Sequence, residues 1–115
     1  PIVSGVGEII SAGTFYDFDS KYNNSDSKSV LDPDLDGETI ERIRKYSKII
    51  FRAMDCHGLA RVDFFLSSSG EVIFNEINTM PGFSNISMYP ILWEAEGIDK
   101  NRLIQSLIDL AYERE

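Results

Sequence analysis

The sequence has little of what several common classes of protein need. It contains one cysteine, Cys56, which excludes an internal disulfide and suits a reducing compartment. No apolar run approaches the roughly 18 residues that a membrane-spanning helix requires, and neither a signal peptide nor a glycine-rich phosphate loop is visible. Positive charge is also scarce. The net charge of −8 argues against nucleic acid or an anionic membrane as a partner.

Length and composition are otherwise those of one soluble domain. The 115 residues suffice for a single domain with a modest core. The hydrophobic content of 43% and the charged content of 26% are ordinary for a globular protein. Because the composition is ordinary, it does not predict a fold class, and that prediction rests on local sequence patterns.

The most informative segment is a predicted β-hairpin that carries charges inside its strands. In "ARVDFFLSSSGEVIFNEINTMPGFSNISMYP", Arg61 and Asp63 interrupt the first apolar strand, and Glu76 and Asn78 close the second. An unpaired charge in a strand interior costs free energy on desolvation, so strands seldom carry such groups without a partner. The concentration of charges in one hairpin predicts a functional site.

A four-residue loop over 67–70 would put the polar groups on one face, because directly opposed residues and alternate residues share a face. The pairs then expected to face each other are Leu66 with Glu71, Asp63 with Phe74, and Arg61 with Glu76. The apolar residues expected on the other face are Val62, Phe64, Leu66, Ile73 and Ile77. A register slip of one residue would scatter the polar set over both faces.

Two interpretations of this polar face stay open at this point. In this register Asp63 and Glu76 are diagonal neighbours, roughly 7–8 Å apart at the backbone, and with Asn78 they offer only oxygen ligands. Oxygen ligands suit Mg²⁺ or Mn²⁺ rather than zinc, and Glu76 could bridge two such ions. Alternatively, Arg61 and Glu76 form a cross-strand ion pair and Asp63 lies at a solvated sheet edge.

The loop "NTMPGFSNIS" after the second strand favours the metal interpretation. Gly82 allows close backbone approach to a ligand, and its N–H could serve as an oxyanion donor. Ser87 stands where an N-cap would open a helix, whose free amides favour an anion. Cations, an arginine and anion-binding amides together fit phosphoryl-transfer chemistry.

The same motifs carry a family resemblance. "ARVDFF" and "NEINTMPGFSNISMYP" resemble the C-terminal part of bacterial D-alanine–D-alanine ligases of the ATP-grasp superfamily, and "GEIISAGTFYDFDSKY" resembles the segment leading into that family's mobile loop. The resemblance spans about Gly7 to Ala111. It implies an α+β fold, with an antiparallel sheet flanked by helices, as the ATP-grasp C-terminal subdomain. Residues 1–115 would form this subdomain, and 17–37 a mobile loop.

The resemblance also implies roles for residues of the hairpin and its loop. Asp63, Glu76 and Asn78 match the ligands of two magnesium or manganese ions, with Glu76 shared. Arg61 matches the arginine that steadies the phosphate-bearing transition state of ATP, and Gly82 matches the glycine of the oxyanion site.

Further matches concern the second substrate and the mobile loop. Ser87 and Met88 match the positions that hold the carboxylate of the second D-alanine. Lys21 and Tyr22 match the pair that closes over the nucleotide phosphates and the substrate. A tyrosine at position 22 is the family pattern for D-alanine, rather than D-lactate, as second substrate.

The function implied is ATP-dependent ligation of two D-alanines through an acylphosphate, for peptidoglycan precursors in the bacterial cytoplasm. The partners are D-alanine and ATP, with a homodimer suggested by resemblance alone. Because the chain starts at Pro1 inside an apparent strand, we expect a C-terminal portion that does not turn over ATP by itself. The alternatives are another ATP-grasp carboxylate–amine ligase and a non-catalytic domain that binds Mg²⁺ and nucleotide.

Helical periodicity predicts three helices around this site. The first covers 38–55, with Asp36 as its cap and Gly58 as its terminator. The second covers 88–96 and ends at Gly97, and the third covers 100–112. The apolar stripe expected to form core on the third helix is Leu103, Ile104, Leu107, Ile108 and Ala111.

Overall fold

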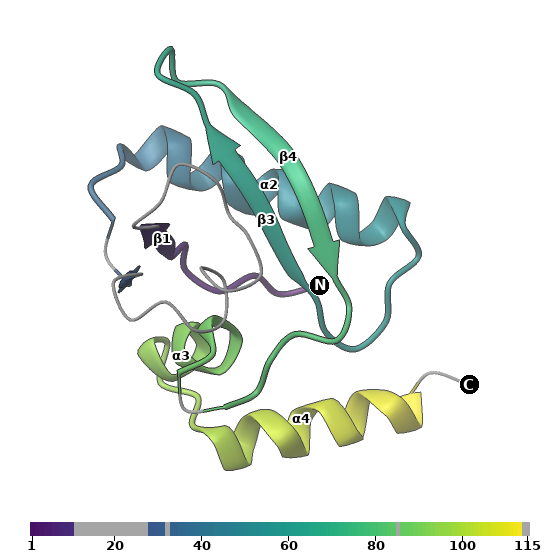
Figure 1. Cartoon of the computed structure of the whole chain (residues 1–115). Helices are drawn as coiled ribbons and strands as arrows, with labels where there is room; N and C mark the ends of the chain where they lie inside the picture. Colours follow the sequence, from purple (N-terminus) through teal and green to yellow (C-terminus); the bar gives the residue numbers. More distant parts are fainter. Residues whose placement is uncertain (11–27, 32, 85, 114–115) are drawn as a thin grey trace.

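The computed structural model describes residues 1–10, 28–31, 33–84 and 86–113. Its elements are β1 (Glu8–Ile10), β2 (Lys28–Val30), α2 (Gly37–Ala53), β3 (Arg61–Leu66), β4 (Val72–Asn78), α3 (Met88–Ala95) and α4 (Lys100–Glu113). Within these ranges, β1 pairs with β2 and β3 with β4, both antiparallel. The β3–β4 hairpin lies across α2, and α3 and α4 lie beyond its open end (Figure 1). The predicted α+β class, an antiparallel sheet flanked by helices, is confirmed.

The segment predicted as a mobile loop, 17–37, contains regular structure at its C-terminal end. β2 lies inside it and pairs with β1 through Glu8 with Val30 and Ile10 with Lys28. The rest of that segment up to residue 27 lies outside the described residues.

The hairpin turn has one residue fewer than the sequence predicted. The Ser67 N–H donates to the Glu71 carbonyl at 2.9 Å, which leaves a loop over 68–70 closed by Gly70 at φ +89°. Three-residue hairpin loops commonly need such a left-handed residue at this position. Leu66 therefore pairs with Val72, and the predicted pairing of Leu66 with Glu71 is wrong.

A β-bulge then restores the predicted polar face. The register shifts between Asp63 and Phe64, and Asn75 is left without a partner. Asp63 consequently faces Glu76, and Arg61 faces Asn78, so the predicted partners Phe74 and Glu76 are each wrong by two places. Without the extra residue, the shorter turn would have put Asp63 opposite Asn75 and turned Glu76 to the other face, since each strand step reverses direction.

The shorter turn also exchanges two apolar residues between the faces. Phe74 pairs with Phe64, and their rings meet edge to face with centroids 6.2 Å apart. Ile73, which was predicted on the face of Phe64, instead pairs with Phe65 beyond the polar groups. The prediction for Ile73 is therefore wrong, because it assumed a loop one residue longer, and a change of one residue in the turn moves each side chain of β4 between the turn and the bulge to the other face.

α2 begins as predicted, with Asp36 as its cap. The Asp36 Oδ1 accepts a hydrogen bond from the Thr39 N–H at 2.6 Å, which satisfies one of the free amides of the first turn. Hydrogen bonds from the Thr39 side chain and N–H hold the pKa of the Asp36 carboxyl below its ordinary value of 3.8. A carboxylate is also favoured here by the helix dipole.

The end of α2 differs from the prediction, because the terminator is Asp55 and not Gly58. Asp55 takes the left-handed conformation at φ +52°, its N–H donates to the Arg52 carbonyl, and the Cys56 N–H donates to the Phe51 carbonyl. These two bonds form a Schellman motif, in which aspartate replaces the usual glycine. α3 ends in the same motif with glycine: Gly97 has φ +89°, as the sequence predicted.

Removing the α2 cap is expected to lower stability in a pH-dependent way. Asp36→Ala should lower the melting temperature at neutral pH, whereas Asp36→Asn, which also accepts at an N-cap, should lower it less. Because the folded-state pKa of Asp36 is lowered, its charge contributes stability above the unfolded-state pKa. That contribution is lost as the pH falls through the folded-state value. The difference in melting temperature between wild type and Asp36→Ala should therefore shrink below about pH 4; a difference that is constant from pH 7 to pH 3 would contradict this.

The buried core is small and centres on α3 and α4. Among the described residues, Met88 and Leu103 are buried, at 9% and 5% exposed, and so are Pro33, Pro81 and Pro90. Gly7 approaches α3 so closely that a Cβ there would lie 2.9 Å from the Met88 sulfur. The predicted core stripe of α4 is confirmed only at Leu103, because Ile104 and Ile108 are 44% and 47% exposed.

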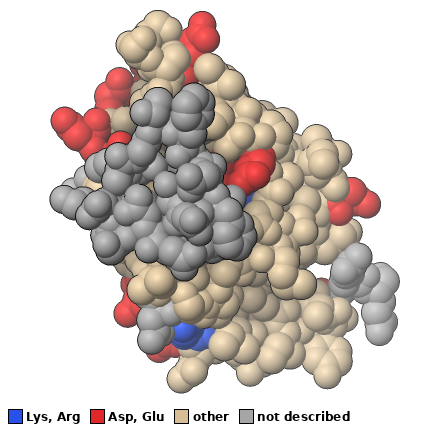
Figure 2. Space-filling view, in the orientation of Figure 1, with Lys and Arg blue, Asp and Glu red and all other residues tan. Residues whose placement is uncertain are grey.

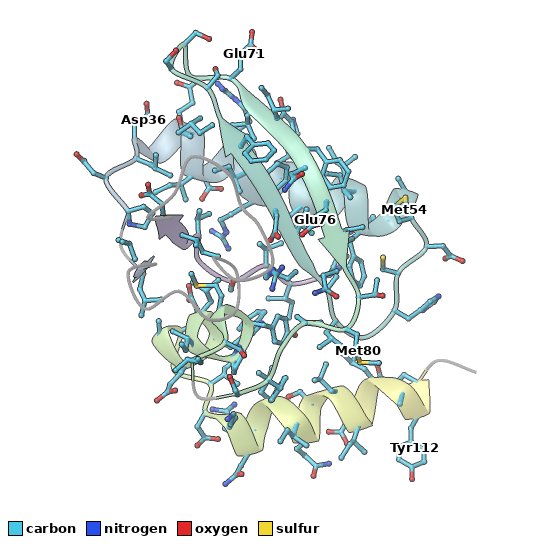
Figure 3. All side chains as sticks on the ribbon, in the orientation of Figure 1. Asp36, Met54, Glu71, Glu76, Met80 and Tyr112 are labelled. Atoms are coloured by element: carbon cyan, nitrogen blue, oxygen red, sulfur yellow. The ribbon has the colours of Figure 1, made fainter. Side chains whose placement is uncertain are left out.

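Large apolar side chains are exposed elsewhere too. Met54, Met80 and Tyr112, labelled in Figure 3, are 61%, 84% and 79% exposed. On the face drawn in Figure 2, tan uncharged atoms predominate outside the grey area, red acidic groups lie near the edges and at one place towards the centre, and blue basic groups show in only small areas. In the part of the chain described, no helix is long and apolar enough to cross a membrane.

Candidate phosphate and metal site

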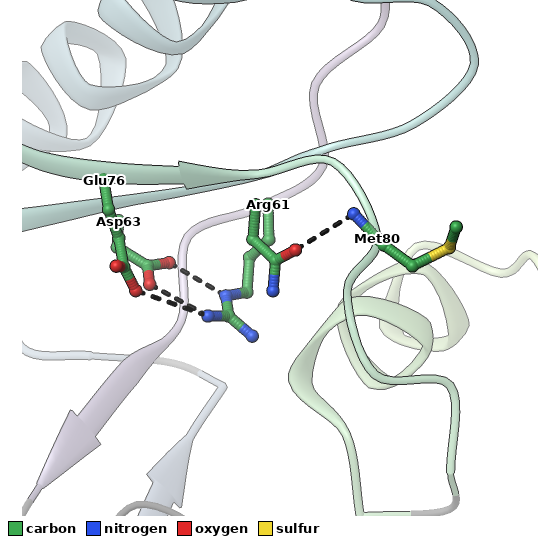
Figure 4. A network of polar contacts seen from close by, with 5 residues as sticks. Arg61, Asp63, Glu76 and Met80 are labelled. Carbon is green, nitrogen blue, oxygen red and sulfur yellow. Dashed lines mark hydrogen bonds and ion pairs between the residues drawn. The ribbon is translucent and has the colours of Figure 1, made fainter. Parts of the chain in front are cut away.

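The predicted site residues of the hairpin lie together on one face. Arg61 and Asp63 come from β3, and Glu76 and Asn78 from the facing residues of β4. In Figure 4 the side chains of Arg61, Asp63 and Glu76 project from the side of the hairpin opposite α2. The register error left this result unchanged, because the turn and the bulge compensate for each other.

Arg61 holds Asp63 through both carboxylate oxygens. Arg61 Nε lies 2.9 Å from Asp63 Oδ1, and Nη2 lies 3.0 Å from Oδ2. Such bidentate pairs are among the stronger hydrogen-bonded contacts in proteins. The two side chains are only 19% and 27% exposed, so solvent screens this pair less than a surface pair.

Glu76 stands at the edge of the same pair. Its Oε1 lies 4.0 Å from Arg61 Nη2, and its side chain is 46% exposed. The predicted ion pair between Arg61 and Glu76 is therefore present at the limit of contact, while the closer partner of Arg61 is Asp63 on its own strand.

Asn78 is oriented by the backbone that follows it. Its Oδ1 accepts a hydrogen bond from the Met80 N–H at 2.9 Å, a turn that leads the chain out of β4 towards α3 (Figures 1 and 4). A carbonyl oxygen has a second lone pair, so this bond leaves Asn78 able to accept from or coordinate another group.

The donor set suits a hard divalent cation. Asp63, Glu76 and Asn78 offer oxygens only, which Mg²⁺ and Mn²⁺ prefer. In the described ranges, no cluster of three or more His, Cys, Asp and Glu side chains is arranged to hold a metal by itself. A cation here would need further oxygens from a ligand, and Mg²⁺ characteristically takes phosphate oxygens beside one or two carboxylates.

The loop after β4 brings Gly82 against Ser87. A Cβ at Gly82 would lie 2.7 Å from Ser87 Oγ, which only glycine avoids. Ser87 occupies the N-cap position of α3 as predicted, but its hydroxyl does not cap the helix. It accepts instead from the Ser84 N–H at 3.0 Å and lies 2.8 Å from the Ser84 hydroxyl. These contacts between Ser84 and Ser87 hold the two ends of the loop segment together.

Met88, the other residue predicted at the second-substrate position, contributes its side chain to the core. Its sulfur packs beneath Gly7, and the side chain is among the buried apolar groups described. A ligand at the start of α3 would therefore meet the Met88 backbone rather than its thioether. Lys21 and Tyr22, predicted to close over the site, lie outside the described residues.

The sequence interpretation missed an aromatic pair beside this loop. Phe83 and Tyr89 lie with ring centroids 5.9 Å apart. Burial raises the pKa of the Tyr89 hydroxyl, and a hydrogen bond with Trp93 opposes that rise. The spacing of Tyr89 and Trp93, four residues apart on one helix, could have shown the contact between those two residues, whereas no sequence signal indicates the pairing of Phe83 with Tyr89.

Gly82→Ala is expected to disturb the loop through this contact. The new methyl group would displace Ser87 Oγ and its two contacts to Ser84, so the melting temperature should fall. Gly37→Ala is the matched control, since a Cβ there meets nothing within 4 Å. Ser87→Ala added to Gly82→Ala should recover part of the loss, because it removes the clashing oxygen. A double variant that is as unstable as the sum of both single changes would contradict this contact.

Solved structures similar to this chain include ligases of D-amino acids. The structure of the VanG D-Ala:D-Ser ligase from Enterococcus faecalis matches 95% of this chain and 32% of that chain, with a TM-score of 0.81 and 38% identity. A D-alanine–D-alanine ligase from Bacillus anthracis complexed with ATP matches 96% of this chain and 36% of that chain, with a TM-score of 0.76 and 28% identity. These neighbours confirm the predicted ATP-grasp fold.

Sequence comparison gives the family. The family model described as "D-ala D-ala ligase C-terminus" matches residues 1–109, so the chain belongs to this family. It is similar to the D-alanine–D-alanine ligase of Acetivibrio thermocellus, with 55% identity over 99% of this chain and 31% of that protein. The D-alanine–D-alanine ligase A of Chromobacterium violaceum is 50% identical over the same shares. The chain therefore spans about a third of the length of the curated relatives it matches.

Proposed function

We propose that this chain is the C-terminal part of a bacterial ligase that joins two D-alanines at the expense of ATP, for peptidoglycan precursors. The observation that carries the proposal is the convergence of Arg61, Asp63, Glu76 and Asn78 on one hairpin face, in a chain of this family. Each of these residues has the chemistry that phosphoryl transfer needs at its position.

In this proposal Asp63, Glu76 and Asn78 would be the residues that hold two Mg²⁺ or Mn²⁺ ions. The bound ions supply charge neutralisation of the phosphate oxygens of ATP. Arg61, at 4.0 Å or closer to both carboxylates, stands beside the same phosphates and stabilises the negative charge that spreads over the transferred group. Lys21 binds the nucleotide phosphates from the mobile loop.

The chemistry proceeds through two displacements. The carboxylate of the first D-alanine attacks the γ-phosphorus of ATP, the bond to ADP breaks, and an acylphosphate forms. The amine of the second D-alanine then attacks the acyl carbon, the carbon–oxygen bond to phosphate breaks, and the dipeptide forms as the amine loses a proton. The Gly82 N–H donates to the oxyanion, and Ser87 with the Met88 backbone holds the carboxylate of the second substrate.

The mobile loop protects the acylphosphate in this scheme. Lys21 and Tyr22 close over the site and exclude water, which would otherwise hydrolyse the intermediate. Tyr22 selects D-alanine rather than D-lactate. Because the VanG neighbour is a D-Ala:D-Ser ligase, D-serine is the second candidate for the acceptor.

The proposed activity requires residues outside these 115. It spans about a third of its relatives, and exposed apolar groups such as Met80, at 84%, and Ile86, at 83%, are consistent with surface that other parts of a longer protein cover. We propose that the 115 residues alone do not turn over ATP, and that the full protein acts in the bacterial cytoplasm as a homodimer. D-alanine–dependent turnover by the isolated chain would contradict the first of these statements.

The test is phosphate release from ATP by the full-length protein, with Mg²⁺ and with or without D-alanine. Release that requires D-alanine, with the dipeptide identified by mass spectrometry, is the expected result. Release that requires D-serine in addition to D-alanine would redirect the proposal to D-serine as the acceptor. Binding of ATP without release for either acceptor would favour another carboxylate–amine ligase or a non-catalytic domain.

A further inference from the structure

The contact between Arg61 and Asp63 has a consequence for how a metal reaches the site. The guanidinium engages both oxygens of Asp63, at 2.9 and 3.0 Å, and Nη2 lies 4.0 Å from Glu76. Asp63 and Glu76 face each other directly across the two strands, and like charges so placed repel. Arg61 therefore supplies, from within the chain, part of the positive charge that this pair of carboxylates requires.

We propose that Arg61 is an internal counter-cation that competes with the divalent cation for Asp63, and that it is released to the phosphates when nucleotide and metal bind together. The inference rests on the proposed function of the same site. It assigns Arg61 a positioning role before the reaction, in addition to its contact with the transferred phosphate.

The competition follows from the geometry of the carboxylate. An ionised carboxylate has about four lone-pair sites, and the bidentate guanidinium uses one on each oxygen. A divalent cation must either displace the guanidinium or bind beside it. In both cases the positive charge of the guanidinium repels the cation. Since Arg61 and Asp63 are 19% and 27% exposed, water screens that repulsion only in part. Metal alone should therefore bind weakly.

Nucleotide changes this balance because its phosphates are an alternative partner for Arg61. An arginine fork matches phosphate as well as carboxylate geometry. Transfer of Arg61 to the phosphates frees Asp63 for the metal, so the two ligands should bind cooperatively. The coupling is reciprocal, since each ligand must raise the affinity of the other by the same factor.

The experiment measures Mn²⁺ binding to the full-length protein without nucleotide, from the electron paramagnetic resonance signal of free Mn²⁺. Arg61→Gln should lower the dissociation constant about tenfold, a change of about 1.4 kcal/mol, because the competing charge is gone. Adding Asp63→Asn to that variant should cancel the gain. Unchanged or weaker Mn²⁺ binding by Arg61→Gln would overturn the proposal.

Arg42→Gln is the matched control. Arg42 pairs with Glu38 at 3.3 Å on α2, so the change removes the same charge and an ion pair away from the hairpin. Its Mn²⁺ affinity should equal that of the wild type, and a gain as large as that of Arg61→Gln would show a mere effect of net charge. Circular dichroism checks that each variant folds. Arg61→Lys keeps the positive charge but loses the bidentate guanidinium, so its gain in Mn²⁺ affinity should be smaller and in the same direction.

The outcomes separate this inference from the proposed function. Mn²⁺ binding to wild type with no gain in Arg61→Gln would remove the counter-cation role and leave the metal site in place. No Mn²⁺ binding by any variant, with or without ATP, would overturn both, because removal of Arg61 should have uncovered the site.

Discussion

Glu76→Gln is expected to lower the rate of D-alanine–dependent phosphate release from the full-length protein by about a thousandfold, the upper part of the range for losing one preorganised charge-stabilising group. Glu76 is the residue proposed to bridge two cations, and it faces Asp63 directly across the hairpin. Glutamine keeps the size of the side chain but removes its charge. The loss should therefore affect metal binding while the fold persists.

The control for Glu76→Gln is Glu71→Gln on the same hairpin. Figure 3 shows Glu71 at the tip and Glu76 towards the opposite end of the hairpin. The Glu71 carbonyl accepts from the Ser67 N–H, and the Glu71 N–H donates to the Ser67 hydroxyl. Because both bonds use the backbone of Glu71, Glu71→Gln removes the same charge as Glu76→Gln and leaves these bonds intact. Phosphate release should stay near the wild-type rate. Normal turnover by Glu76→Gln would remove the metal-site hypothesis.

Leu103→Ala should be among the most destabilising substitutions in this chain. Leu103 lies near the start of α4 and is 5% exposed, and few other apolar side chains among the described residues are so deeply buried. Truncation of a buried leucine loses the transfer free energy of the removed atoms and leaves a cavity, together about 2–5 kcal/mol. The loss should appear as a lower midpoint of urea unfolding with an unchanged slope.

Ile104→Ala provides the comparison on the same helix. Ile104 is 44% exposed in this chain, so its truncation should cost clearly less than that of Leu103. Equal losses in the two variants would contradict the placement of α4. In the full-length protein the Ile104 variant could become more costly, if another part of the polypeptide covers that face.

The candidate site was predictable because its residues are close in sequence. Arg61 and Asp63 alternate on one strand and Glu76 and Asn78 on the next, so alternation predicts that each pair shares a face, and the register across the short turn decides whether the two faces coincide. The prediction reached that face through a wrong register. It assumed a four-residue loop and an unbroken ladder, whereas Gly70 closes a shorter loop and Asn75 adds a bulge.

Helix starts were also better predicted than helix ends. Asp36 forms the cap that its side-chain chemistry favours, because the acceptor and the amide lie within one turn. The end of α2 was misplaced because aspartate at position 55 adopts a conformation that glycine usually takes. Glycine was a reliable signal at Gly97, where the same motif ends α3.

By itself, the sequence determined the strands, the helices and the polar face of the hairpin, since each depends on residues within a turn or a strand pair of one another. Only the three-dimensional structure showed which partner Arg61 takes and how closely Gly82 approaches Ser87, and packing between elements decided which apolar groups are buried. Alternation fixes the direction of a side chain but not its contacts, and an apolar stripe becomes core only where another element covers it. Leu103 and Ile104 are adjacent members of one predicted stripe, yet only the first is buried, because packing between elements sets burial.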